Sequence, residues 1–317
     1  MNQVAVVVHK GKLAAIRGDD PCDLLRRALR ARGEPAPKLY PTSSGDAGGE
    51  AARAALDEGA QLVVVCGGDG TVSACAAVLA GSGVPMAVVP IGTGNLVARN
   101  LGIPQAPAAA VQIAVTGVER AVDVGRLDGA VMVGMAGVGL DAAMVHDAPR
   151  WLKRRVGWPA YVVSLVRHLA DRGFTATVEV DGERIRYRHV RTVVIGNVGG
   201  LHGGLSLFPD ARPDDGVLEV AVLAPRTALG WVPVAGRLLR GQGQGQGQEH
   251  EQGQGRGQGS SSAVVRRRGR HIVVSGQHPL RREVDGEPLA DDPVLDVVVE
   301  PGALLLRVDP VGALDPA

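Results

Sequence analysis

The sequence is poor in cysteine and in long apolar runs. Its 317 residues include only three cysteines, Cys22, Cys66 and Cys75, and no two of them form a C-x-x-C pair. This pattern excludes a disulfide-rich secreted domain and a cysteine-based zinc site, and it favours a reducing compartment. No uncharged stretch reaches the ~18 apolar residues of a membrane span, and the run Val4–Val8 is too short for a signal peptide. We therefore expect a cytoplasmic protein.

Net charge is also nearly absent. Lysine and arginine together number 34, aspartate and glutamate 33, and the formal net charge is +1. This balance argues against a protein that binds nucleic acid through bulk positive charge. Glycine, by contrast, is abundant: 45 residues are about twice the usual share, which predicts frequent tight turns and close backbone approaches.

The first 125 residues alternate short apolar runs with helical patterns. The expected strands are Val4–Val8, Pro37–Tyr40, Leu62–Cys66 and Met86–Val89, and the expected helices are Asp20–Ala31, Gly49–Glu58 and Thr71–Ala80. Such alternation predicts parallel strands joined by right-handed crossovers, and hence a doubly wound α/β domain over residues 1–125.

After about Gly125, short strands with hairpin turns such as Asp181-Gly182 predict a mainly antiparallel β domain over residues 126–301. One long helix is expected over Arg150–Asp171. A last strand within 302–317 is expected to return to the first domain. Residues 241–262 alternate Gly and Gln and predict a disordered surface loop, with a glutamine-rich contact segment as the alternative.

Two glycine-rich loops follow consecutive predicted strands. In the first, Gly67-Gly68-Asp69-Gly70-Thr71 leads directly into a helix, where free N–H groups can bind an anion. A carboxylate beside phosphate requires a Mg²⁺ between them, so Asp69 is interpreted as a metal-side ligand. A tight turn capped by Asp69 is the alternative. The second loop, Pro90-Ile91-Gly92-Thr93-Gly94-Asn95, has the same design, and two such loops favour phosphate binding above the strand ends.

The order of these and later motifs resembles the catalytic domain of diacylglycerol kinases, sphingosine kinases and bacterial lipid kinases. The later motifs are Asp123-Val124-Gly125, Gly139–Ala142, Gly203-Gly204-Leu205, Pro209-Asp210-Ala211, Asp214–Leu218 and Asp285-Gly286-Glu287-Pro288. The resemblance covers essentially the whole chain. It implies phosphorylation by ATP, with Mg²⁺, of a hydroxyl of diacylglycerol or a related lipid alcohol, in a cleft between the two domains.

The resemblance also implies a role for each site residue. ATP would be bound by Thr42, Gly67, Gly68, Asp69, Gly70, Thr71, Val72, Ser73 and Thr93. Asp69 would hold the catalytic Mg²⁺, directly or through water. Of Asp285 and Glu287, one would accept the substrate proton and the other would orient it or the metal. Without the other motifs, these two residues would simply flank a hairpin turn.

A second, structural Mg²⁺ is implied at the Asp214-Asp215-Gly216 run. Its ligands would be the carbonyl oxygens of Arg212 and Val217 and the carboxylate of Asp215. A plain Asx turn is the alternative. The chain departs from the family at its first loop, where His9–Lys12 replaces the usual Asn-Pro-x-x-Gly. Lys10 and Lys12 are interpreted either as phosphate contacts or as surface residues.

Cations and two tryptophans over Arg150–Tyr161 predict a peripheral membrane contact, with a partly buried helix as the alternative. Two other functions stay open: a kinase of a soluble alcohol such as a sugar, nucleoside or metabolite, and a nucleotide-binding regulator without catalysis. The carboxylates of Asp69, Asp285 and Glu287 argue against the regulator. The sequence also leaves a homodimer open, and it does not name the acceptor.

Overall fold

The structure of the protein is a computed structural model. It describes residues 3–13, 18–42, 46–139, 173–201, 205–225, 231 and 264–310. The helix expected over Arg150–Asp171, with the membrane contact at Arg150–Tyr161, lies outside the described residues, as does the Gly/Gln loop 241–262. Among the helices that the structure describes, none combines the length and the hydropathy of a membrane span.

The N-terminal part is a doubly wound parallel sheet, as the sequence predicts. Its strands are β1 (Val4–Val8), β2 (Lys38–Pro41), β3 (Leu62–Gly67) and β4 (Met86–Pro90), in the order β4-β3-β1-β2. Strands β1, β3 and β4 are buried along their whole length, which explains their continuous valine-rich runs.

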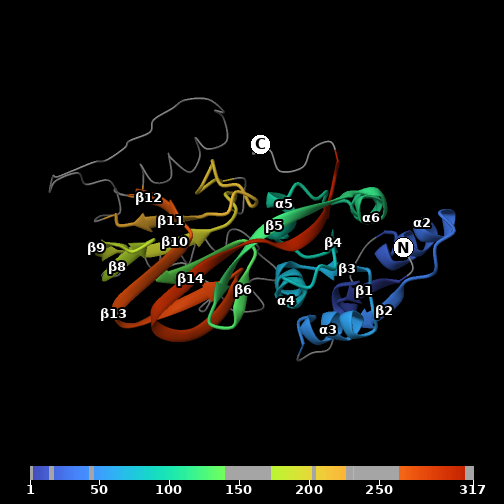
Figure 1. Cartoon of the computed structure of the whole chain (residues 1–317), viewed down its shortest axis with the longest axis horizontal. Helices are drawn as coiled ribbons and strands as arrows, with labels where there is room; N and C mark the ends of the chain where they lie inside the picture. Colours follow the sequence, from blue (N-terminus) through green and yellow to red (C-terminus); the bar gives the residue numbers. More distant parts are fainter. Residues whose placement is uncertain are drawn as a thin grey trace.

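Helices cover both faces of this sheet. They are α1 (Lys10–Leu13), α2 (Pro21–Ala31), α3 (Gly49–Asp57), α4 (Asp69–Leu79), α5 (Leu96–Asn100) and α6 (Pro107–Thr116). Helices α2 and α6 pack together on one side, and α3 and α4 pack together on the other (Figure 1). Because the helices cover the two faces of the sheet, the loops that follow the strands lie at its edge.

The C-terminal part is an antiparallel sheet. It contains β6 (Ala130–Met132), β7 (Met135–Gly139), β8 (Phe174–Val180), β9 (Glu183–Val190), β10 (Thr192–Gly196), β11 (Leu218–Leu223), β12 (Val264–Gly269) and β13 (His271–Val284). The central order is β12-β11-β10-β7-β13, with β8 paired to β13 and β9 paired to β8. The predicted Asp181-Gly182 hairpin is confirmed: Val180 pairs with Glu183, and both turn residues have positive φ.

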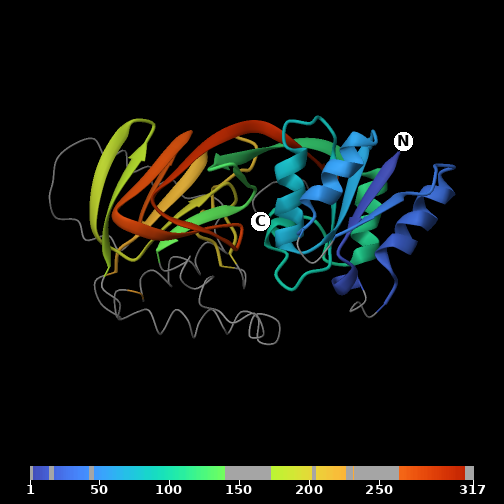
Figure 2. The same cartoon turned by 90° about the horizontal axis from the view of Figure 1, so that it is seen from below.

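Two long strands join the two parts into one sheet, which has 14 strands within the described residues (Figure 2). They are β5 (Val118–Leu127) and β14 (Glu287–Val308), which run antiparallel to each other. The start of β14 pairs with β13, and its end lies parallel to β4 through Leu306 and Met86. Residue 125, where the sequence suggested a boundary, lies inside β5.

Candidate active site

The loops that follow the four parallel strands meet at one edge of the sheet. Thr42 follows β2, and its N–H donates to the carbonyl of Val8 at the end of β1 (2.9 Å). The N–H of Ile91, after β4, donates to the carbonyl of Gly67 at the end of β3 (2.9 Å). The structure therefore brings Thr42, the loop 67–73 and the loop of Thr93 to the same edge, where ligands bind in open α/β sheets.

The first glycine-rich loop turns directly from β3 into helix α4. Gly68 is the N-cap, and its carbonyl accepts from Thr71 and Val72, each at 3.0 Å. A Cβ atom on Gly67 would lie 2.5 Å from the Cβ of Thr71, so only glycine fits there. The turn consequently presents the N-terminus of an 11-residue helix toward the edge, an arrangement suited to an anion.

The second loop packs against the first, backbone to backbone. A Cβ atom on Gly92 would lie 2.7 Å from the Cα of Gly68. The Asp69 carboxylate accepts a hydrogen bond from the N–H of Val97 (3.1 Å) at the start of α5, which ties the two loops together. Asp69 has no other hydrogen-bond or ion-pair partner among the described residues, so one of its oxygens faces no protein donor there. A single carboxylate with phosphate oxygens is a donor set that fits Mg²⁺.

Asn95 organises the second loop, a role that the sequence analysis missed. Its backbone is left-handed (φ 50°), and its side chain is 7% exposed. Its side-chain oxygen accepts from the N–H of Gly92 (2.9 Å), and its amide donates to the carbonyl of Gly92 and to Gln105, each at 3.0 Å. Asparagine is one of the few residues that readily adopts this conformation. Thr93 lies between Gly92 and Asn95 in the chain, and its side chain is exposed.

The Asp285-Gly286-Glu287 motif is the tight turn between β13 and β14. Val284 pairs with Glu287, and the turn residues Asp285 and Gly286 have φ values of 48° and 82°. These values belong to a two-residue hairpin that requires positive φ at both positions. A Cβ atom on Gly70 would lie 2.8 Å from Oε1 of Glu287. The hairpin therefore places Glu287 against the first glycine-rich loop.

The two carboxylates of this turn have different surroundings. Asp285 accepts four hydrogen bonds: from the N–H groups of Val133 (2.9 Å), Gly134 (2.8 Å) and Met135 (2.9 Å), and from the Ser73 hydroxyl (3.0 Å). Burial raises the pKa of the Asp285 carboxyl, although each of these hydrogen bonds acts in the opposite direction. Glu287 is exposed and has no hydrogen-bond or ion-pair partner among the described residues. Of the two carboxylates in this turn, Glu287 is therefore the one whose oxygens are not occupied by donors of the described residues.

Asn100 also connects the two parts, in addition to the Asp285-Gly286-Glu287 turn, and the sequence gives no indication of this contact. The side chain of Asn100, at the end of α5, donates to the carbonyl of Gly200 (3.0 Å) and accepts from its N–H (2.7 Å). A Cβ atom on Gly200 would lie 2.7 Å from this oxygen. Gly200 lies shortly before the predicted Gly203-Gly204-Leu205 motif, of which residues 203 and 204 lie outside the described residues.

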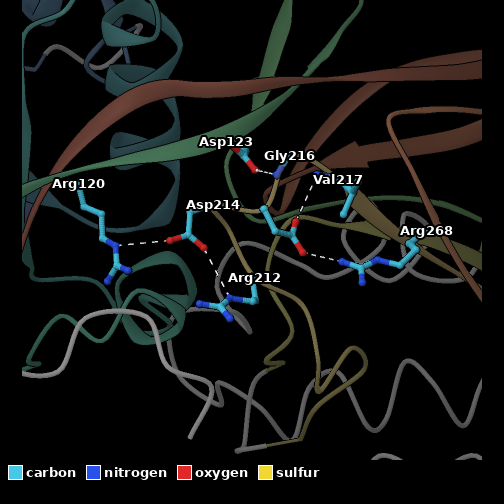
Figure 3. Close-up of polar contacts among 8 residues, drawn as sticks. Arg120, Asp123, Arg212, Asp214, Gly216, Val217 and Arg268 are labelled. Atoms are coloured by element: carbon cyan, nitrogen blue, oxygen red, sulfur yellow. Dashed lines mark hydrogen bonds and ion pairs between the residues drawn. The ribbon is translucent and has the colours of Figure 1, made fainter. Parts of the chain in front are cut away.

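The run Asp214-Asp215-Gly216 forms a turn that docks on the junction of the two parts (Figure 3). Asp123, 2% exposed on β5, accepts from the N–H groups of Gly216 (2.6 Å) and Gly302 (2.8 Å). Asp215 accepts from the N–H of Val217 (3.3 Å), the Asx turn that the sequence left as the alternative. Its other oxygen pairs with Arg268 at 2.5 Å.

The structural magnesium site at Arg212, Asp215 and Val217 stays a prediction. Its residues, as arranged, fit such an ion poorly, because the Asp215 carboxylate already faces a guanidinium. Among the residues that the structure describes, no group of three or more His, Cys, Asp or Glu side chains could hold a metal ion.

Comparisons with known proteins agree with this architecture. Residues 7–127 match the family model described as "Diacylglycerol kinase catalytic domain", and residues 133–244 match "YegS C-terminal NAD kinase beta sandwich-like domain". A crystal structure of a diacylglycerol kinase from Bacillus anthracis superimposes with a TM-score of 0.73 at 22% identity, covering 98% of both chains. This structural likeness shows the shared fold.

Curated relatives show the family. A Pseudomonas aeruginosa protein named "Probable lipid kinase YegS-like" is 33% identical over 267 residues, which are 82% of this chain and 80% of that protein. The "Diacylglycerol kinase" of Bacillus subtilis is 31% identical over 207 residues, or 63% and 67% of the two chains. A Synechocystis protein, "Uncharacterized protein sll0036", is 30% identical over 242 residues, and this chain spans about half of its length (52%). The chain belongs to the diacylglycerol kinase-like family of lipid kinases that includes the YegS-like proteins.

Proposed function

We propose that this protein transfers the γ-phosphate of ATP, with Mg²⁺, to a hydroxyl group of diacylglycerol or a related lipid alcohol. The observation that carries the proposal is the contact of Glu287 with Gly70, which sets a free carboxylate against a phosphate-binding loop. Family membership supports the kinase chemistry, and the choice of a diacylglycerol-like acceptor rests on the names of the relatives.

The nucleotide is bound at the carboxyl edge of the parallel sheet. The N–H groups at the start of α4 bind its phosphates, and Thr93 and Thr42 line the same edge. Asp69 holds the magnesium ion, which supplies neutralisation of the phosphate charge when bound. The bond from Asp69 to Val97 keeps the two loops in a fixed relation, so that the phosphates lie in a preset position.

Glu287 is the proton acceptor in this proposal. As the acceptor oxygen bonds to the γ-phosphorus, the bond from that phosphorus to the β–γ bridging oxygen breaks and ADP leaves. The proton of the attacking hydroxyl passes to the Glu287 carboxylate. Asp285 is a positioning residue, because its acceptor sites are taken by Ser73 and by the loop 133–135. Those contacts hold the turn on α4.

The test is transfer of label from γ-labelled ATP with Mg²⁺ to diacylglycerol, monoacylglycerol, sphingosine or ceramide in mixed micelles. Label in a chloroform-soluble product is expected, and the acceptor that gains it identifies the substrate class. Asp69→Asn is expected to abolish the transfer while far-UV circular dichroism stays unchanged. Asp291→Asn, an exposed carboxylate on β14, is the matched control and should retain wild-type activity.

Other outcomes would replace the proposal. With sugars and nucleosides offered in place of the lipids, label in a water-soluble product other than ATP and inorganic phosphate would indicate a soluble alcohol as acceptor. ATP binding without any transfer would indicate a regulator. Association with the membrane surface through Arg150–Tyr161 is part of the proposal, and it rests on the sequence of that segment.

A further inference from the structure

Arginine side chains from three places surround the two carboxylates of the turn at residues 212–217 (Figure 3). Asp215 pairs with Arg268 of β12 at 2.5 Å. Asp214 pairs with Arg120 of β5 at 3.5 Å and with Arg212 at 3.8 Å. Each carboxylate of the turn therefore already has a positive counter-charge supplied by the chain itself.

Strand pairing fixes the position of Arg268. β12 runs antiparallel to β11, and Arg268 lies directly opposite Glu219 in the register. Its Nε atom lies 3.3 Å from Oε1 of Glu219, while an Nη atom contacts Asp215. A planar guanidinium with several donors can engage two carboxylates at once in this way. The strand register thus places Arg268 beside Glu219, and the contact with Glu219 holds its guanidinium next to Asp215.

A divalent cation and this guanidinium would compete for the same carboxylate. Mg²⁺ requires several oxygen ligands at short distances and in nearly octahedral geometry. One oxygen of Asp215 accepts the N–H of Val217, and the other faces Arg268. Arginine keeps its proton throughout the physiological pH range, so Arg268 remains a cation there. A second cation beside it would be repelled.

The turn matters because it is docked on the junction of the two parts. The buried Asp123 on β5 binds the N–H of Gly216, and its own N–H donates to the carbonyl of Pro213 (2.6 Å). The same carboxylate binds Gly302 of β14. A change in the turn is therefore transmitted to both strands that join the two parts.

We propose that Arg268 is the counter-charge of the Asp215 turn in this protein, at the place where the family resemblance implies a structural magnesium ion. The turn folds without a divalent metal. This inference concerns folding, and it is independent of the acceptor and of catalysis.

Thermal unfolding of the full chain without nucleotide tests this proposal. The background is Asp69→Asn, so that the metal ligand of the proposed active site does not contribute. With Arg268 present, the melting temperature in EDTA and in excess MgCl₂ should agree to within about 1 °C. Arg268→Ala should lower the melting temperature in EDTA by about 2 °C, and magnesium should restore it. Arg270→Ala, an exposed arginine beside β12, is the control and should respond like the parent.

A saturable rise of the parent melting temperature with magnesium, lost in Asp215→Ala, would overturn the proposal. An Arg268→Ala protein as stable as the parent, or one insensitive to magnesium, would also overturn it. If Arg268→Ala does not fold, Mn²⁺ binding to the Asp69→Asn protein, followed by electron paramagnetic resonance, decides the question. The proposal expects the amount of bound Mn²⁺ to be the same with and without Asp215→Ala. It fails if Asp215→Ala removes a bound Mn²⁺ ion.

Discussion

Asp285 and Glu287 are separated by one residue, and the hairpin between β13 and β14 gives them opposite environments. Asp285 is enclosed by donors from the loop 133–135 and from α4, whereas Glu287 is exposed beside Gly70. The oxygens of Asp285 already accept four hydrogen bonds from the protein, so they offer a substrate hydroxyl no open acceptor position. The two side chains should therefore respond differently to removal of their charge.

Glu287→Gln is expected to lower kcat by about 10²–10⁴-fold, the range that general base catalysis contributes. The free energy of unfolding should not change, because the side chain is exposed and has no hydrogen-bond or ion-pair partner among the described residues. Steady-state kinetics and urea denaturation measure the two effects. Wild-type kcat in this variant would remove Glu287 from the proposed mechanism.

Asp285→Asn is expected to destabilise the fold by about 1–3 kcal/mol, the cost of leaving buried donors without an acceptor. The new amide group would face N–H donors of Val133, Gly134 and Met135 in place of a carboxylate oxygen. Urea denaturation followed by fluorescence measures this loss. An unchanged unfolding midpoint would show that the four contacts contribute nothing to stability.

The same pair of proteins should differ in pH dependence. Because burial raises the pKa of Asp285 in the folded state, the native protein holds this proton more tightly than the unfolded chain does. Its contribution to stability is therefore fully present below the unfolded pKa of about 3.9 and is lost as pH rises through the folded pKa. The difference in unfolding free energy between wild type and Asp285→Asn should shrink over that acidic range. A difference that grows with pH would contradict the raised pKa.

At the scale of elements, the two glycine-rich loops depend on each other through a backbone contact. Gly92→Ala would put a Cβ atom 2.7 Å from the Cα of Gly68, and backbone atoms cannot move aside as a flexible side chain can. We expect weaker ATP binding by calorimetry, because the first loop must shift. Gly81→Ala is the control: its φ of 78° strains an alanine, yet nothing lies within 4 Å of the new Cβ atom. It should lose stability and keep its affinity for ATP.

Local sequence patterns predict the parallel half of the fold well. The valine runs of β1, β3 and β4, the helix after Gly68 and the Asp-Gly hairpins all follow from periodicity and turn chemistry that neighbouring residues determine. The helices α5 and α6 were not predicted, because α5 has only five residues and the apolar α6 shows little amphipathic pattern.

Contacts between distant segments were beyond the reach of such patterns. Nothing near Ser73 indicates that it binds Asp285, and nothing near Asn100 indicates Gly200. In the same way, the pairing of Arg268 with Asp215 depends on the register of β11 and β12. Motif order predicts the family, and through it the candidate site residues. Only the folded chain shows that the oxygens of Asp285 are occupied by protein donors and those of Glu287 are not.

For the whole molecule, β5 and β14 contribute side chains to two hydrophobic cores. Val122 of β5 and Leu306 of β14 belong to the N-terminal core, whereas Leu127 and Leu295 of the same strands belong to the C-terminal core. Because two continuous strands are shared, neither half can unfold without disturbing the ladder of the other.

The protein should consequently unfold in one cooperative transition, with a calorimetric enthalpy close to the van't Hoff value. Leu306→Ala, which removes a fully buried side chain, should cost about 2–5 kcal/mol and lower that single transition as a whole. Differential scanning calorimetry measures both quantities. Two separate peaks, of which only one moves in the variant, would show that the halves are independent.

The end of β14 also constrains the order of events during synthesis. Leu304, Leu306 and Val308 complete the core of a half that otherwise consists of the first 125 or so residues, and Leu306 pairs beside Met86. On the ribosome, the N-terminal half is therefore incomplete until β14 has been made, and one edge of β4 remains unpaired until then. Unpaired strand edges are templates for aggregation. A chain that stops before residue 302 would leave the ribosome with both glycine-rich loops made and the sheet that carries them unfinished.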